Sequence, residues 1–77
     1  MSRVQSSVLV VEDDIDLRQT IVESLEAAGF AAAQAVDAAD ASERLKAYAY
    51  DALVVDLRLP DADGMVVLDE ALSRYPD

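Results

Sequence analysis

The chain reads Ala52-Leu53-Val54-Val55-Asp56 across residues 52–56, an apolar run that ends in a carboxylate. The run is too short for a helix and is bounded by polar residues, which is typical of a buried β-strand. An earlier run of the same kind, Val8-Leu9-Val10-Val11, is followed by Glu12-Asp13-Asp14. Two hydrophobic strands that both end in carboxylates predict one acidic pocket on the rim of a sheet.

Helical spacing of apolar residues marks three further segments. The three apolar stripes are Leu17, Ile21, Leu25 and Ala28; then Ala41, Leu45 and Tyr48; then Leu68, Ala71, Leu72 and Tyr75. We expect these stripes to lie in the core. Gly29 supplies a stop for the first helix, and Asp37 can cap the second. Gly64 then opens the third helix, and Pro76 ends it.

Strand and helix patterns alternate along the chain, with residues 30–36 as a second strand whose alanines give it a poor strand propensity. The order βαβαβα predicts an α/β fold with a parallel sheet. In a flavodoxin-like sheet the first and third strands are neighbours, so three strands are expected in the order 2-1-3. Adjacent strands lie about 4.8 Å apart, which would let Asp13 and Asp56 reach a single ion. We expect residues 1–7 to be a flexible leader.

Composition excludes several classes of function. The 77 residues are 53% hydrophobic, which suits one small globular domain. Six Lys+Arg against 16 Asp+Glu leave a net charge of -10, so this piece should repel nucleic acid. Cysteine and histidine are absent, which excludes disulfides, Cys/His zinc sites and an imidazole base. The apolar runs are too short to span a membrane, and a cytoplasmic location is expected.

The acidic pocket requires a positive partner. Two carboxylates about 4 Å apart repel by roughly 4 kcal/mol at an effective dielectric constant near 20. Either a pKa rises or a cation binds. Oxygen ligands favour magnesium, calcium or manganese, and an incomplete protein ligand set that leaves positions for water and phosphate suits Mg²⁺ best. Asp56 would then be a nucleophile that forms an aspartyl-phosphate.

The segments Val10-Val11-Glu12-Asp13-Asp14 and Asp56-Leu57-Arg58-Leu59-Pro60-Asp61-Ala62-Asp63-Gly64 resemble the receiver domain of bacterial two-component response regulators. The second segment has every specified position of that family's D-x-x-x-P-x-x-D-G signature. The resemblance implies that Asp56 accepts phosphate from the phosphohistidine of a sensor histidine kinase, with Mg²⁺. It also implies that Asp13 and Asp56 bind the metal directly, Glu12 mainly through water, and Arg58 through its backbone carbonyl.

The same resemblance implies that residues 8–77 are a partial receiver domain without its last two βα units. Those units carry a Ser or Thr hydroxyl and a Lys that contact the phosphoryl group, whereas Lys46, the only lysine here, belongs to the second helix. A receiver assists its own phosphorylation and dephosphorylation and is not a turnover enzyme. Most response regulators control transcription, but no DNA-binding element is evident, so that role is an analogy.

A three-stranded sheet in this order would leave its third strand as an open edge. We therefore expect self-association through Ala52 to Val55, or pairing with a chain that supplies the missing half. The alternative function is a truncated receiver that acts only as an interaction or dimerisation module, without phosphotransfer.

Other readings of the carboxylates are weaker. Asp56 as an ordinary solvated strand end does not explain its pairing with Glu12-Asp13 and with the Pro60 and Gly64 positions. We expect Asp14 to cap the first helix rather than to bind metal. Asp61 and Asp63 are expected to serve the turn and the start of the last helix.

Two other families use similar carboxylates. A calcium-binding EF-hand loop would place its first ligand on Leu59, which has no side-chain oxygen, and Pro60 would follow. A haloacid-dehalogenase-like phosphatase needs a second Asp two residues after the first, where Arg58 stands. Neither pattern fits as well as the receiver signature.

Overall fold

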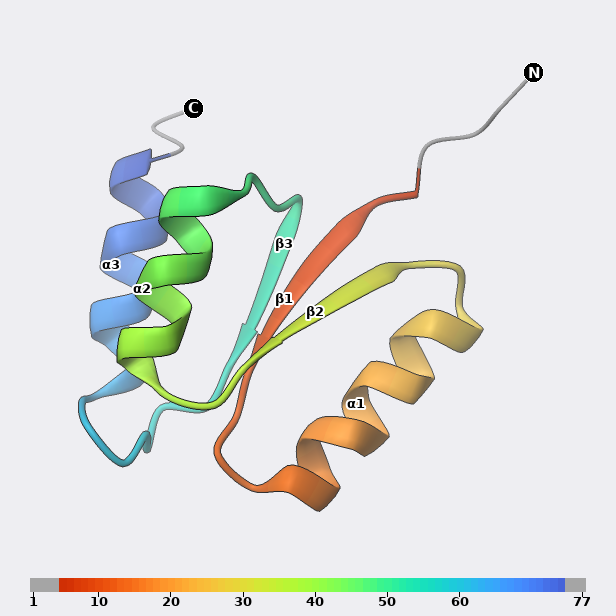
Figure 1. Cartoon of the computed structure of the whole chain (residues 1–77), viewed down its shortest axis with the longest axis horizontal. Coiled ribbons are helices and arrows are strands. Elements are labelled where there is room, and N and C mark those ends of the chain that lie inside the picture. Colours follow the sequence, from red (N-terminus) through yellow and green to blue (C-terminus); the bar gives the residue numbers. More distant parts are fainter. Residues whose placement is uncertain (1–4, 75–77) are drawn as a thin grey trace.

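A three-stranded parallel sheet lies between helices on its two faces in the computed structural model, which describes residues 5–74 (Figure 1). The elements are β1 (Ser7–Val11), α1 (Ile15–Ala27), β2 (Ala31–Ala35), α2 (Ala38–Ala47), β3 (Ala52–Val55) and α3 (Gly64–Arg74). The strand order β2-β1-β3 confirms the predicted α/β topology. β1 begins at Ser7, which is the last residue of the segment expected to be a leader. The rest of that leader up to residue 4, and the stop expected at Pro76, lie outside the described residues.

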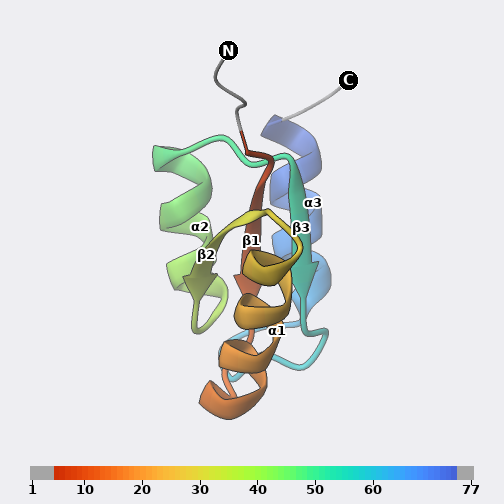
Figure 2. The ribbon, with the colours of Figure 1, turned by 90° about the vertical axis from the view of Figure 1, so that its right-hand side faces the viewer.

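β1 is the centre of the core. Val8, Leu9, Val10 and Val11 are each at most 2% exposed. Successive strand residues face opposite sides of a sheet, so a strand covered on both faces is apolar throughout. Leu9 and Val11 pack under α2 and α3, and Val8 and Val10 pack against Val22 of α1. Figure 2 shows α1 on one side of the sheet and the other two helices on the opposite side.

The alanine-rich segment forms β2 despite its weak strand propensity. Ala31–Ala35 pairs in register with Ser7–Val11, and the Glu12 N–H extends the ladder to the Ala35 carbonyl at 3.1 Å. β1 is buried, so its backbone groups need partners on both edges. That tertiary demand overrides the local preference of the alanines.

The predicted helix boundaries are confirmed where the structure describes them. Asp14 caps α1 by accepting from the Asp16 and Leu17 N–H groups at 3.0 and 3.1 Å. Asp37 caps α2 by accepting from the Asp40 N–H at 2.8 Å. Gly29 follows α1 with φ of +97°, a conformation that other residues rarely adopt.

The prediction that whole apolar stripes lie in the core is wrong for four residues. Leu17, Tyr48 and Leu72 are 48%, 63% and 68% exposed, and Ala28 of the first stripe is exposed as well. In α1 the buried positions are Arg18 and Val22 instead. Periodicity defines a stripe's direction around a helix but not how far a narrow sheet reaches beneath it. Tyr75, the last residue of the third stripe, lies outside the described residues.

β3 is the least covered strand. Ala52 and Val54 are exposed on the face that α1 leaves open, while Leu53 and Val55 are partly buried under the other two helices. One edge of β3 pairs with β1, and its other edge has no strand beside it within residues 5–74. The expected open edge is therefore present in the described part of the chain.

Replacing Gly64 should destabilise the fold more than replacing Gly29. A Cβ at Gly64 would overlap the Asp56 carbonyl oxygen and lie 2.8 Å from Leu57 Cα, whereas a Cβ at Gly29 meets nothing within 4 Å. We expect Gly64→Ala to lower the free energy of unfolding by about 3 kcal/mol. Gly29→Ala should cost about 1–2 kcal/mol through backbone strain alone. Urea unfolding followed by circular dichroism measures both, and equal losses would contradict the steric argument.

Candidate functional site

The carboxyl ends of β1 and β3 are level with each other. Val11 is the register partner of Val55, and the Asp56 N–H donates to the Val11 carbonyl at 3.0 Å. The residues that follow each strand therefore leave the sheet at the same edge. This register brings Asp56 next to Glu12 and Asp13, although more than forty residues separate them in the sequence.

Glu12, Asp13 and Asp56 form one acidic cluster. Each offers a carboxylate oxygen, and these oxygens lie within 4.8 Å of one another. Mg²⁺ binds oxygen at about 2.0–2.1 Å, so ligands on opposite sides of the ion lie about 4 Å apart. The oxygens are thus close to the separation that one small cation requires. Glu12 is only 6% exposed, Asp56 is half-buried and Asp13 is exposed.

Backbone N–H groups hold two of these carboxylates in place. The Asp14 N–H donates to Glu12 Oε2 at 3.1 Å, and the Arg58 N–H donates to Asp56 Oδ1 at 2.9 Å. Each bond engages one oxygen and leaves the other for a metal ion or a substrate. The loop that follows each strand therefore orients the carboxylate that ends it.

The pKa of Glu12 is raised above its usual value. Burial is the largest cause, because it disfavours the charged form, and the nearby carboxylates of Asp56 and Asp13 act in the same direction. The bond from the Asp14 N–H opposes the shift in part. A divalent cation would relieve both the repulsion and the burial penalty.

The loop between Asp56 and α3 is closed at its base. The Gly64 N–H donates to the Leu57 carbonyl at 3.0 Å, and Arg58 and Asp63 form an antiparallel bridge. The base of the loop thus engages the Leu57 carbonyl and not that of Arg58, the expected fourth ligand. Asp63 caps α3 by accepting from the Met65 N–H at 2.9 Å, as predicted.

Asp61 has a role beyond the turn and the start of α3, which were the roles predicted from the sequence. Its two carboxylate oxygens accept from the Ala38 and Ala39 N–H groups, at 2.9 and 3.0 Å, at the start of α2. The bond from Ala38 is the largest cause of a lowered pKa at Asp61. The loop that carries Arg58 is thereby tied to a second helix. No local sequence signal reports this contact, because the partners lie more than twenty residues apart.

The remaining acidic and basic candidates have other partners. Glu70 accepts from the Ser42 hydroxyl and pairs with Arg74, and Leu59 is buried, so no calcium loop forms there. Lys46 pairs with Glu43 on α2 at 3.2 Å. Arg58 remains where a dehalogenase-like site would need an acid.

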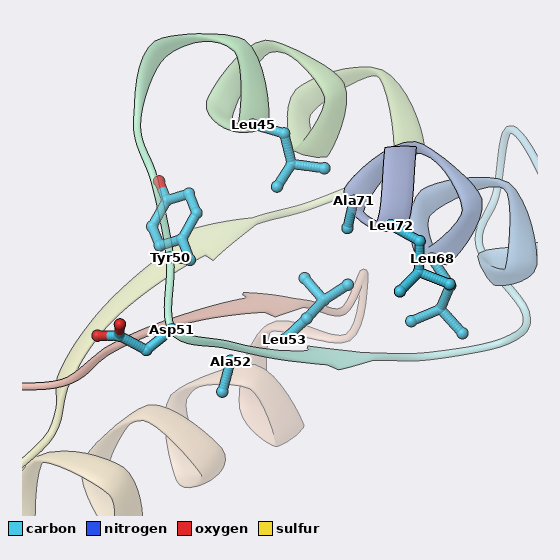
Figure 3. Close-up of a pocket in the computed structure, with 8 residues that line it drawn as sticks. All are labelled: Leu45, Tyr50, Asp51, Ala52, Leu53, Leu68, Ala71 and Leu72. Carbon is cyan, nitrogen blue, oxygen red and sulfur yellow. The ribbon is translucent and has the colours of Figure 1, made fainter. Parts of the chain in front are cut away.

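A separate apolar groove of about 400 Å³ lies beside the first half of β3 (Figure 3). Leu45 of α2 and Leu53 of β3 point toward each other across it, and Leu68 and Leu72 of α3 line one side. Asp51 lies at its rim, one strand length from Asp56. The groove is therefore distinct from the acidic cluster.

Comparison with known proteins assigns the family. The family model of the response regulator receiver domain matches residues 8–77. The chain belongs to this family. The receiver protein CpdR of Brucella abortus is 34% identical over 70 residues, which cover 91% of this chain and 58% of CpdR.

Solved receiver structures share the fold of this receiver domain. The non-phosphorylated HemR receiver domain of Leptospira biflexa has a TM-score of 0.87 at 32% identity, covering 95% of this chain and 59% of that one. Response regulator TrrA of Thermotoga maritima, solved in complex with Mg²⁺-BeF, has a TM-score of 0.88 at 24% identity, covering 94% and 63%. The chain spans less than two thirds of each of these three relatives. Among its described helices, none has the length and apolar character to cross a membrane.

The Asp61 contact of this receiver domain predicts a pH-dependent contribution to stability. Its folded-state pKa lies below the ordinary 3.8, so its contribution is complete above pH 3.8 and is lost as the pH falls through the folded value. We expect Asp61→Asn to lower the urea midpoint near neutral pH and to converge with the wild type in acid. Asp69→Asn, an exposed change of equal charge on α3, is the control. Equal midpoints for both variants near neutral pH would contradict the role of Asp61.

Proposed function

We propose that this receiver domain accepts a phosphoryl group on Asp56 from the phosphohistidine of a sensor histidine kinase. The observation that carries the proposal is the convergence of the Glu12, Asp13 and Asp56 carboxylates at the carboxyl edge of the sheet. Parallel α/β sheets bind ligands at this edge, between strands that lie next to each other but not in chain order. Membership of the receiver family supports the same role, since receiver domains are phosphoacceptors.

The chemistry of the cluster suits Mg²⁺ as cofactor. We assign Asp13 and Asp56 as direct ligands, Glu12 as a ligand through water, and Arg58 as a ligand through its backbone carbonyl. When bound, the ion offsets negative charge on the incoming phosphoryl oxygens. The Mg²⁺-BeF complex of TrrA, a protein of the same fold, is in keeping with this assignment.

Asp56 supplies the nucleophile. Its Oδ1 is held by the Arg58 N–H, which leaves Oδ2 to attack phosphorus. The new O–P bond forms as the P–N bond to the kinase imidazole breaks, and the imidazole nitrogen keeps the electron pair and takes up a proton. The product is an aspartyl-phosphate on the receiver and a neutral histidine on the kinase.

The wider assignment belongs to the same proposal. Residues 8–77 correspond to the first part of a receiver domain, which two further βα units with a Ser or Thr and a Lys would complete. The protein acts in the cytoplasm as a signalling component rather than as a turnover enzyme. Its net charge of -10 argues against nucleic-acid binding by this piece.

Phosphorylation of the purified chain tests the main proposal. Incubation with acetyl phosphate and Mg²⁺ should add the mass of one phosphoryl group, because Asp56 is oriented and the cluster can hold the ion. Asp56→Asn should abolish the gain, and omission of Mg²⁺ should reduce it strongly. Asp51→Asn, a change of equal charge at the opposite end of β3, is the control and should leave the gain intact. Intact-protein mass spectrometry reads each result.

The absence of a mass gain in the wild-type chain would contradict the phosphoacceptor role of this polypeptide. A gain that survives in Asp56→Asn would place the phosphate elsewhere. Either result would favour the second function, a module that associates without phosphotransfer.

The second function rests on the open edge of β3 and the groove beside it. The Asp56 N–H donates to the Val11 carbonyl of β1 at 3.0 Å, and groups on a strand alternate between its two edges. The N–H groups of Leu53 and Val55 therefore point away from β1. With the apolar groove alongside, this edge suits a second copy of the chain, paired strand to strand. A chain that carries the two further βα units of a receiver would use the same edge.

A lysine on this edge should prevent self-association. We expect the wild-type chain to form dimers whose affinity rises with salt, because two copies of charge -10 repel and salt screens that repulsion. Val54→Lys should yield a monomer. Val36→Lys makes the same charge change at a comparably exposed valine beyond β2 and should still dimerise. Sedimentation velocity measures all three, and a monomeric wild type at high salt would contradict this function.

A further inference from the structure

Arg18 is a charged residue buried in α1, on the side that faces the sheet. It is 8% exposed, although arginine is rarely buried without a partner. Its Nη1 donates to the Glu12 backbone carbonyl at 2.8 Å, and its Nε donates to Gln34 Oε1 of β2 at 2.9 Å. Neither the proposed phosphotransfer nor the core packing explains why a cation occupies this place.

Both hydrogen-bond partners of Arg18 are neutral. No carboxylate of residues 5–74 forms an ion pair with it. A guanidinium stays charged at every ordinary pH, and a buried charge without compensation is costly. The acidic cluster can supply this compensation, because the carbonyl that Arg18 binds belongs to Glu12, a member of that cluster.

Arg18 completes the anchoring of Glu12. The Glu12 N–H donates to the Ala35 carbonyl, its own carbonyl accepts from Arg18, and its carboxylate accepts from the Asp14 N–H. The bond from Arg18 is the one that holds the peptide between Glu12 and Asp13. The direction of that peptide sets where the Asp13 side chain leaves the backbone.

We propose that Arg18 is a positioning residue for the cation site. Its hydrogen bond to the Glu12 carbonyl holds the Glu12–Asp13 peptide in place, and its positive charge stabilises the negative charge of the carboxylate cluster. This inference rests on the proposed function, since it concerns the same site. It goes beyond that function by adding a residue that touches neither metal nor phosphate. Outer-shell partners of this kind commonly change metal affinity by about 10–100-fold when they are removed.

The test compares the Mg²⁺ affinity of four variants with that of the wild type, by isothermal titration calorimetry on protein shown to be folded by circular dichroism. Arg18→Met should weaken Mg²⁺ binding about tenfold or more. Arg18→Lys keeps the charge and should weaken it less. Arg44→Met, the same change at a partly exposed arginine of α2, should leave the affinity within about twofold, since distant surface charges are screened.

A fourth variant separates positioning from general stability. Val22→Ala truncates a buried side chain one turn from Arg18 on the same helix face, so it destabilises the fold but leaves the Glu12 carbonyl bonded. Its Mg²⁺ affinity should match that of the wild type. Equal losses of affinity in Val22→Ala and Arg18→Met would overturn the proposal and make Arg18 a structural residue only.

If Arg18→Met does not fold, the Mg²⁺ affinity of Arg18→Lys tests the proposal. An affinity equal to that of the wild type would overturn it. If neither folds, Gln34→Ala decides in the same way, because it keeps Arg18 and removes the acceptor of its Nε. Amide resonances of Asp13 and Asp14 in metal-free protein give a second readout, which Arg18→Lys should shift and Val22→Ala should not. A wild type that binds no Mg²⁺ would overturn the proposed metal site, while these resonances would still decide whether Arg18 positions the peptide.

Discussion

The parallel pairing of β1 on both of its edges is the constraint on which the rest of the structure depends. Val8 to Val11 are almost completely buried, so their backbone groups must be bonded within the sheet. This requirement brings the alanine-rich β2 to one edge and β3 to the other. The two pairings also align the carboxyl ends of the strands. The acidic cluster therefore follows from the hydrogen bonding of an apolar strand.

The cluster is held largely by backbone groups, which suits a site where charges must lie close together. Glu12 and Asp56 each accept a backbone N–H from the loop that follows their strand. Charged side chains act in the same way from outside the cluster. Asp61 binds two N–H groups of α2, and Arg18 binds the Glu12 carbonyl. Each loop around the site is thus fastened to a neighbouring element, so that oxygens that repel one another can be kept within reach of one ion.

The two ends of β3 have different chemistry. Its carboxyl end leads into the acidic cluster, while its first half borders an apolar groove and an edge that has no neighbouring strand among residues 5–74. A cation can compensate the negative charge of the acidic cluster, whereas the groove and the edge can be covered only by another apolar or strand-forming surface. The proposed phosphotransfer and the proposed association therefore involve different ends of one strand, and we expect a variant to alter either one alone.

The order of the elements, the caps at Asp14 and Asp37, and the acidic ends of two strands follow from the amino-acid sequence, because they depend on neighbouring residues and on simple periodicity. The exposure of Leu17, the burial of Arg18 and the bonds from Asp61 to the start of α2 follow from the packing of the elements. Those outcomes depend on which surface lies opposite each side chain. The pattern along a chain predicts on which side of its element a side chain lies. The residue that this side chain contacts belongs to another element, which becomes a neighbour only when the chain folds.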